Sequence, residues 1–224
     1  MSQPDRPGQF DRAIERRYGR WVGALAIVIL ALITLNTVLT KPNGAAGLAP
    51  GAALPPFAVP LASGDLRGAA NVSTGVSGRG GAKSRACAVR GPRILNICAL
   101  YESGPLVLAL FIDASGCARI LTDMQTLVPQ FPGVRFAAVS IKGDRGALRA
   151  LVHKQGLSFP VGIDEEGTLV ALYKTASCPQ VTFAYPGGVT QGKALLLRPP
   201  LATLRARVEE LVAGSRARGW SPGA

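Results

Sequence analysis

The hydrophobic pattern divides the chain into one long apolar run near its start and a series of shorter segments after it. Residues 22–40 contain no charged residue. From residue 56 onward, continuous apolar runs alternate with stretches in which apolar residues recur every three or four positions. Continuous runs are typical of buried strands, and the recurring spacing is typical of amphipathic helices. The alternation predicts an α/β domain over residues 56–214, with a mixed central sheet flanked by helices.

The predicted elements have recognisable boundaries. We expect strands at residues 106–112, 134–141, 157–163, 181–184 and 190–197, and two shorter ones at 84–90 and 93–98 around a Gly-Pro turn. We expect helices that begin at Cys117, at Asp144 as a capping residue, at Thr168 and after Pro200. The spacing puts Met124 on the buried face of the first helix, and we expect His153 of the second to be exposed.

The long apolar run predicts a membrane helix. At about 1.5 Å per residue, a helix over residues 22–40 spans roughly 30 Å, the thickness of a bilayer core. Five arginines precede the run and Lys41 follows it, which favours a cytoplasmic N-terminus. A cleaved signal peptide is the alternative, but the apolar run is long and no clean A-x-A cleavage site follows Thr40, which favours an uncleaved anchor.

These patterns give the expected organisation of the chain. It comprises a cytoplasmic tail at 1–20, a single transmembrane helix at 21–41, a flexible linker at 42–55, an extracytoplasmic domain at 56–214 and a C-terminal tail at 215–224.

The composition narrows the choice of partners. The formal net charge is +12 at pH 7. Because the arginines are scattered and not interleaved with aromatic residues, we expect no nucleic-acid partner; a basic surface beside an anionic membrane is the simpler interpretation. The chain has a single histidine, so we expect no metal site, and we expect no cofactor.

Four cysteines suggest disulfides in a domain outside the cytoplasm. None of them forms a C-x-x-C pair. Cys87 and Cys98 flank the predicted turn, and a hairpin there would bring their Cα atoms within the range of about 4–7 Å that a structural disulfide needs. The alternative is that both are small buried hydrophobic residues.

Cys117 has the features of a reactive thiol. It follows a buried strand and opens a helix, where the helix dipole and the free backbone N–H groups favour the thiolate and lower the pKa of the thiol. Arg119 adds a positive charge nearby. Asp113 could relay protons, or could raise the pKa of the thiol by charge repulsion. The alternative role for Asp113 or Ser115 is to cap the helix.

A second cysteine stretch carries a family resemblance. Cys178 stands directly before Pro179, at the entry to a predicted strand, and an X-Pro bond at such a place can be cis. The order of elements, together with FPVGID, Gly167 and LYKTASCP, resembles the thioredoxin-like superfamily, in particular its membrane-anchored redoxins of the TlpA, ResA and AhpC/TSA types. The resemblance implies a thioredoxin-like fold, a cis bond before Pro179, and Cys178 lying over the sulfur of Cys117.

The chain departs from the active-site motifs of that superfamily. The tryptophan and one cysteine of W-C-x-x-C are missing, and so are the proline and hydroxyl residue that precede a peroxidatic cysteine. Three functions therefore stay open. The first is a membrane-tethered thiol–disulfide oxidoreductase, in which Cys117 attacks protein thiols and disulfides of the cell envelope and Cys178 resolves. The second is a peroxiredoxin-like thiol peroxidase that uses Cys117. The third is a redox-inactive binding module with a permanent Cys117–Cys178 bridge.

Overall fold

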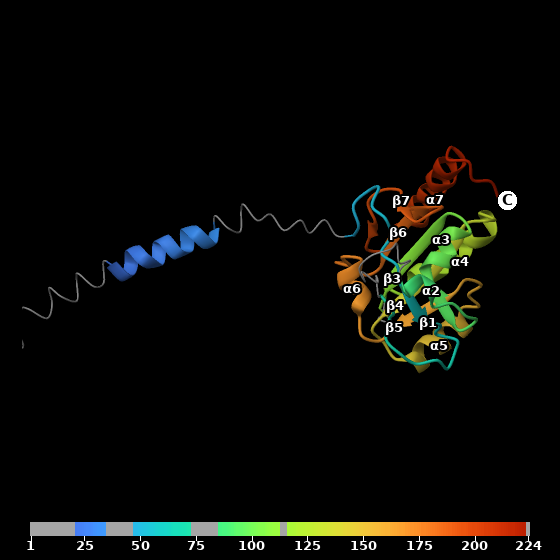
Figure 1. The fold of residues 1–224 in the computed structure, drawn as a ribbon, viewed down its shortest axis with the longest axis horizontal. Coiled ribbons are helices and arrows are strands. Elements are labelled where there is room, and N and C mark those ends of the chain that lie inside the picture. The colour runs from blue at the N-terminus through green and yellow to red at the C-terminus, as the bar shows by residue number, and fades with distance from the viewer. Residues whose placement is uncertain (1–20, 35–46, 73–84, 113–115, 223–224) are drawn as a thin grey trace, which may run out of the picture. The chain divides into compact units, whose positions relative to one another are not determined.

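The computed structural model describes residues 21–34, 47–72, 85–112 and 116–222 (Figure 1). The chain forms two compact units, Met1–Gly44 and Ala45–Ala224. In the first unit, residues 21–34 form a helix whose side chains are exposed. Among the described residues, no helix combines the length and the apolar character needed to cross a bilayer. The predicted transmembrane helix extends beyond residue 34, outside the described residues.

A mixed sheet of six strands forms the centre of the second unit, in agreement with the hydrophobic pattern. Its strand order is β5-β4-β3-β6-β7, and β8 also pairs with β6. Three strands run parallel and are buried except at Arg135: β3 (Leu106–Phe111), β4 (Arg135–Ile141) and β5 (Val161–Asp164). The antiparallel strands are β6 (Gln180–Tyr185), which pairs with β3, and β7 (Val189–Thr190) and β8 (Leu195–Leu196), which pair with β6. The single strand expected at 190–197 is thus split into two short ones.

Helices cover both faces of this sheet (Figure 1). Alternate residues of β3 point to opposite faces, as the pleat of a strand requires, so Phe111 and Leu110 belong to different core clusters. One face packs against α4 (Arg119–Leu127), η1 (Val128–Gln130), α5 (Arg145–Lys154) and α7 (Leu201–Arg216). The other face packs against α3 (Ile97–Glu102) and α6 (Thr168–Leu172). Met124 is fully buried and His153 is exposed, as the helical spacing indicates.

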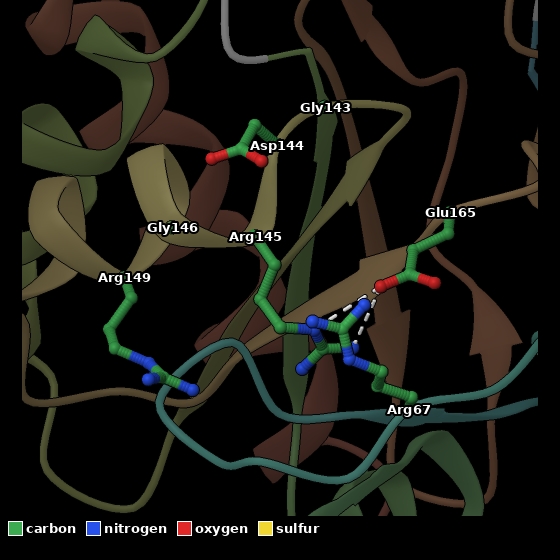
Figure 2. Close-up of a pocket in the computed structure, with 7 residues that line it drawn as sticks. All are labelled: Arg67, Gly143, Asp144, Arg145, Gly146, Arg149 and Glu165. Carbon is green, nitrogen blue, oxygen red and sulfur yellow. Dashed lines mark hydrogen bonds and ion pairs between the residues drawn. The ribbon is translucent and has the colours of Figure 1, made fainter.

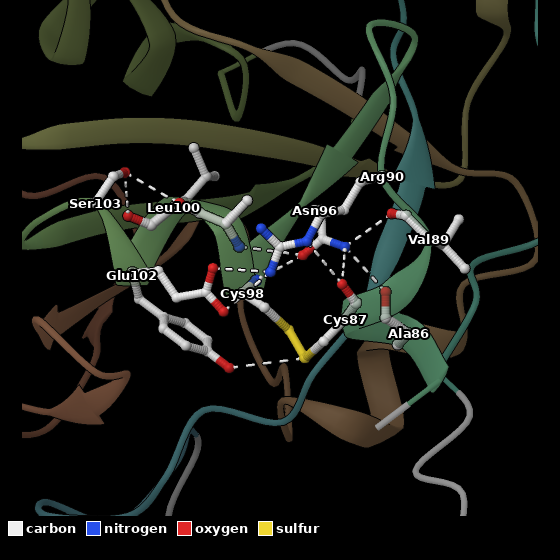
Figure 3. A network of polar contacts seen from close by, with 11 residues as sticks. Ala86, Cys87, Val89, Arg90, Asn96, Cys98, Leu100, Glu102 and Ser103 are labelled. Carbon is white, nitrogen blue, oxygen red and sulfur yellow. Dashed lines mark hydrogen bonds and ion pairs between the residues drawn. A yellow bond between two sulfur atoms is a disulfide. The ribbon is translucent and has the colours of Figure 1, made fainter. Parts of the chain in front are cut away.

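The segment with the first two cysteines is helical where we expected strands. Cys87 lies in α2 (Arg85–Ala88) and Cys98 in α3, and only Ile94–Asn96 forms a strand, β2, which pairs with β1 (Ala58–Pro60). The cause is Asn96, whose side-chain oxygen accepts hydrogen bonds from the N–H groups of Cys98 and Ala99 and so starts a helix directly after the strand. The expected hairpin is therefore wrong, but the Cys87–Cys98 disulfide is present, with its Cα atoms 5.4 Å apart (Figure 3).

The folded unit extends into the residues expected to form a linker. The N–H of Gly51 donates to the Thr190 carbonyl at 3.0 Å, and that of Leu54 donates to the Gly188 carbonyl at 2.7 Å. The Tyr173 hydroxyl donates to the Pro55 carbonyl at 2.8 Å. Burial raises the pKa of Tyr173 well above its usual value, so the phenol stays protonated as a donor. Residues 47–55 are thus fixed on the domain.

The C-terminal end of the domain also differs from the sequence interpretation. We expected the closing helix to end before Gly214, yet α7 continues to Arg216. Ser215, which we placed in the tail, is fully buried and its hydroxyl donates to the Leu211 carbonyl. The small size of Gly214 has a packing reason, because a Cβ there would lie 2.8 Å from the Tyr185 ring.

We predict that Asn96→Ala destabilises the domain. The buried amide donates to the carbonyls of Ala86, Cys87 and Val89, and its oxygen caps α3 (Figure 3). The variant leaves these buried groups without partners, so we expect a loss of about 2–3 kcal/mol in the free energy of unfolding. Chemical denaturation with the disulfides intact measures this loss.

Ser103→Ala is the matched control for Asn96→Ala. The Ser103 hydroxyl bonds to carbonyls of the same helix but is exposed to water. Its removal should change the free energy of unfolding by less than about 0.5 kcal/mol. Equal losses in the two variants would contradict the role given to Asn96.

Candidate functional site

The two remaining cysteines meet at one end of the central sheet. Cys117 and Cys178 form a disulfide with their Cα atoms 5.5 Å apart, although 61 residues separate them in the sequence. Cys117 follows β3 and Cys178 precedes β6. These strands are antiparallel neighbours in which Leu110 faces Gln180, so the end of β3 lies beside the start of β6. The pairing is the one that the family resemblance implies.

Cys117 lies just before a helix and not within it. The residues from Gly116 to Ala118 form a turn, and α4 begins at Arg119. The Cys117 carbonyl accepts a hydrogen bond from the N–H of Ile120 at 3.4 Å, so the cysteine adjoins the first turn of α4. We expected the helix to begin at Cys117 itself. The helix dipole also favours a negative charge at the observed position, directly before the first turn. Arg119 is exposed. Asp113 and Ser115 lie outside the described residues, so their roles stay predictions.

Two features fix the position of Cys178, a hydrogen bond to its sulfur and the peptide bond that follows it. Its sulfur accepts a hydrogen bond from the backbone N–H of Ile112 at 3.2 Å, and a donor at this place favours a negative charge on the sulfur once the bond is reduced. The Cys178–Pro179 peptide bond is cis, as the resemblance implies, and Pro179 is buried. The two cysteines themselves are half-buried, so a reagent or a partner can approach the disulfide from one side.

Exposed apolar side chains lie close to the disulfide. Ile112, whose amide contacts Cys178, is 37% exposed. In and after β8, which pairs with the start of β6, Leu196 is 41% and Leu197 is 65% exposed. We did not single out these residues in the sequence, because three consecutive leucines at 195–197 read equally well as part of a buried strand. Their exposure provides an apolar surface beside the sulfur atoms.

A short segment braces the two cysteine stretches against each other. We call residues 195–198 the brace. The N–H of Leu197 donates to the Ser177 hydroxyl at 3.2 Å, directly before Cys178. Arg198 makes two hydrogen bonds to the Asp123 carboxylate in α4, at 2.7 and 2.9 Å. These bonds to Asp123 raise the pKa of Arg198. The brace therefore connects α4, which follows Cys117, to the segment that carries Cys178.

The second disulfide lies on the other side of the sheet. Cys178 packs against the core cluster beneath α4, α5 and α7, whereas Cys87 and Cys98 belong to the opposite cluster. Tyr101 is a polar neighbour of that bridge, with its hydroxyl 3.9 Å from the Cys87 sulfur. Burial raises the pKa of Tyr101. The central sheet separates the two bridges, so Cys87–Cys98 has the position of a structural clip.

The described part of the chain offers no cluster of three or more His, Cys, Asp or Glu residues that could hold a metal ion. The two buried acidic residues of the described part have partners. Asp123 pairs with Arg198, and Asp164, which is fully buried, accepts a hydrogen bond from the N–H of Leu169 at the start of α6.

No family model and no curated protein matches the chain. Solved structures do. A candidate thiol:disulfide interchange protein DsbE from Chlorobium tepidum is 13% identical, with a TM-score of 0.55 over 75% of this chain and 98% of that one. A candidate protein disulfide isomerase from Bacteroides thetaiotaomicron is 12% identical, with a TM-score of 0.55 over 77% and 97%. The peroxidoxin BcpB from Mycobacterium tuberculosis is 12% identical, with a TM-score of 0.52 over 76% and 97%.

These structures show that the chain has the thioredoxin-like fold. They include proteins named for disulfide exchange and one named as a peroxidoxin. The fold alone thus does not choose between the two chemistries, because one fold can carry several sites.

We predict that Arg198→Ala makes the Cys117–Cys178 bond easier to reduce. Without the ion pair to Asp123 the brace holds α4 less firmly, and the effective concentration of one thiol near the other falls. We expect the equilibrium constant for bond formation to fall about two- to fivefold. Alkylation of the protein in thiol–disulfide buffers of known ratio gives this constant.

Two further variants make this test specific. Arg205→Ala removes an exposed arginine of α7 and should leave the constant unchanged. Asp123→Ala should have the effect of Arg198→Ala, and the double variant should add little to it, because both single changes remove the same contact. Equal constants for Arg198→Ala and Arg205→Ala would rule out the brace as a positioning element.

Proposed function

We propose that this chain is a membrane-tethered, extracytoplasmic thiol–disulfide oxidoreductase that works through Cys117 and Cys178. The observation that carries the proposal is the half-buried disulfide at the end of β3, which adjoins a helix N-terminus and exposed apolar side chains. Proteins named for disulfide interchange and disulfide isomerisation share the fold, which supports the same chemistry here. The substrates are protein thiols and disulfides of the cell envelope.

In the proposed reaction Cys117 attacks and Cys178 resolves. The Cys117 thiolate attacks one sulfur of a substrate disulfide; that S–S bond breaks, and the leaving thiolate takes a proton from water. The Cys178 thiolate then attacks the Cys117 sulfur of the mixed disulfide and releases the second substrate thiol. Two electrons pass to the substrate, and the chain is left with the Cys117–Cys178 bond. A thiol reductant restores the dithiol, and the same steps in reverse oxidise a substrate.

Three features of the site serve these steps. The start of α4 and the Arg119 charge favour the attacking thiolate. The Ile112 N–H favours charge on the Cys178 sulfur. The brace holds the two segments at the distance at which the bond can close again. Asp113 is proposed to relay the proton of Cys117, and Ser115 to cap the turn that follows it.

The two other functions make different demands on the same bond. A redox-inactive binding module needs a Cys117–Cys178 bridge that is never reduced. A peroxiredoxin-like peroxidase needs a Cys117 thiolate that reacts with peroxide, although the proline and hydroxyl residue that usually assist are absent from the sequence before it. The reduction potential of the Cys117–Cys178 bond distinguishes the oxidoreductase from the binding module. Peroxide consumption distinguishes the oxidoreductase from the peroxidase.

We predict that the Cys117–Cys178 pair titrates at roughly −120 to −270 mV, the range of working oxidoreductases. The measurement is a redox titration of the full-length protein in detergent, with free thiols alkylated and the pairs mapped by mass spectrometry. Cys117→Ser should abolish the titration of this pair. The Cys87–Cys98 bridge, read in the same digest, is the internal control and should open only below about −300 mV. A Cys117–Cys178 bond that resists reduction in the working range would leave the binding module as the better proposal.

We predict that the full-length protein fractionates with membranes and resists alkaline carbonate extraction. A variant that lacks residues 1–41 should be released, because the uncharged run at 22–40 is removed with them. Protease added outside intact cells with a permeabilised outer layer should digest the domain, since the arginines before the run favour a cytoplasmic N-terminus. N-terminal sequencing of the membrane form distinguishes an anchor from a cleaved signal peptide, and release of the full chain by carbonate would contradict the tether.

A further inference from the structure

A pocket of about 440 Å³ opens where β4 and β5 end (Figure 2). Its walls come from the start of α5, from the residue after β5 and from the loop that follows β1. The lining consists of three arginines, two acidic residues and two glycines: Arg67, Arg145, Arg149, Asp144, Glu165, Gly143 and Gly146. None of these residues has a role in the disulfide site described above.

Arg145 forms the fixed wall of the pocket. Its side chain is only 9% exposed. Two of its nitrogens donate to the same Glu165 oxygen at 3.1 and 3.2 Å, and a third donates to the Leu61 carbonyl at 3.1 Å (Figure 2). Glu165 therefore neutralises Arg145. Asp144 is occupied too, because its carboxylate caps α5 by accepting from the Ala147 N–H at 2.8 Å.

The other two arginines form no ion pair within the part of the chain that the structure describes, although Arg93, and to a smaller extent Arg149, lowers the pKa of the nearby Asp65. Arg149 donates to the carbonyls of Gly64 and Ala62, at 2.5 and 3.5 Å, and a carbonyl does not neutralise its charge. Arg67 is exposed and makes no hydrogen bond or ion pair with the part of the chain that the structure describes. Two guanidinium groups that form no ion pair within the described residues thus face one pocket, and a guanidinium is well suited to a planar carboxylate, which it binds with two parallel hydrogen bonds.

The charge of the lining favours a single carboxylate over a polyanion. Three arginines against Asp144 and Glu165 leave one net positive charge. One carboxylate balances this charge. A doubly charged phosphate would exceed it and would also meet the two acidic side chains of the wall.

The pocket lies at the same edge of the sheet as the disulfide. Because β3, β4 and β5 are parallel, their carboxyl ends meet at one edge. Cys117 follows β3, and the pocket residues follow β4 and β5. Arg149 donates to residues 62 and 64, which lie along the outer edge of β5, where Leu61 pairs with Gly162. Neighbouring strands lie about 4.8 Å apart, so Arg149 lies roughly 10–15 Å across the sheet from β3. An extended peptide covers that distance in about three to five residues.

We propose that the arginine pocket binds an acidic side chain of the protein substrate, three to five residues from the cysteine that reacts with Cys117. The inference rests on the proposed function and adds a substrate class to it. Arg67 and Arg149 bind the carboxylate, and Arg145, held by Glu165, keeps the wall in place. Substrates with a nearby Glu or Asp are then exchanged faster than neutral ones.

Two peptides that differ at one residue test the preference. Both contain one disulfide, with Glu or Gln three residues from the reacting cysteine, and both are mixed with the reduced full-length protein. We expect the second-order rate constant to be roughly tenfold higher for the Glu peptide. High salt should reduce the difference, because it screens the exposed charges of Arg67 and Arg149.

Matched double variants connect the preference to the pocket. Arg67→Ala with Arg149→Ala should bring the Glu peptide to the rate of the Gln peptide. Arg205→Ala with Arg216→Ala removes the same charge from exposed positions of α7 and should keep the preference. Arg67→Ala alone removes no hydrogen bond or ion pair within the described residues, so it should leave the fold intact. It should still reduce the preference several-fold, and this result would show that the effect comes from lost binding and not from unfolding.

A binding measurement separates this proposal from the proposed function. Versions of both peptides with serine in place of cysteine are labelled, and their binding is followed by fluorescence anisotropy. Tighter binding of the Glu version without any disulfide exchange would support the pocket and contradict the oxidoreductase. Exchange at equal rates for Glu and Gln would overturn the pocket proposal and leave the oxidoreductase standing. Binding of inorganic phosphate in the absence of any preference for Glu would overturn the assignment to a carboxylate.

Discussion

The antiparallel pairing of β3 with β6 is the constraint on which the candidate site depends. It sets Leu110 opposite Gln180 and so brings the turn after β3 beside the residue before β6. Both strands are buried, and a shift of one residue would move apolar side chains of β3 from one core cluster to the other. The packing of two cores therefore fixes this register, and the distance between Cys117 and Cys178 follows from it.

The same register explains why the two sides of the site differ. On the β6 side, the cis bond before Pro179 and the Ile112 amide determine where the Cys178 sulfur lies. On the β3 side, Cys117 lies in a turn that leads directly into α4. The brace also connects these sides, through Ser177 and Asp123.

The sequence predicts the elements of this fold better than the contacts between them. Runs of buried residues and helical spacing were sufficient for the central strands, for Asp144 as a cap and for the burial of Met124, because these features depend on nearby residues. The short α2 and α3 were taken for strands, because a single buried asparagine decides their conformation. The brace and the pocket were missed for another reason. Arg198 reaches Asp123 across 75 positions, and Arg145 reaches Leu61 across 84, and no local pattern reports such pairs.

The two disulfides enclose very different lengths of chain. Cys87–Cys98 closes a loop of 11 residues, whereas Cys117–Cys178 closes one of 61, which contains α4, η1, β4, α5, β5 and α6. In the chain-entropy account, a cross-link of the first kind restricts the unfolded chain by about 3 kcal/mol and one of the second kind by about 4 kcal/mol. Reduction of Cys117–Cys178 thus releases more than two thiols. It lifts the larger topological restraint on the unfolded ensemble, so the domain with this bond reduced is the less stable of the two redox forms.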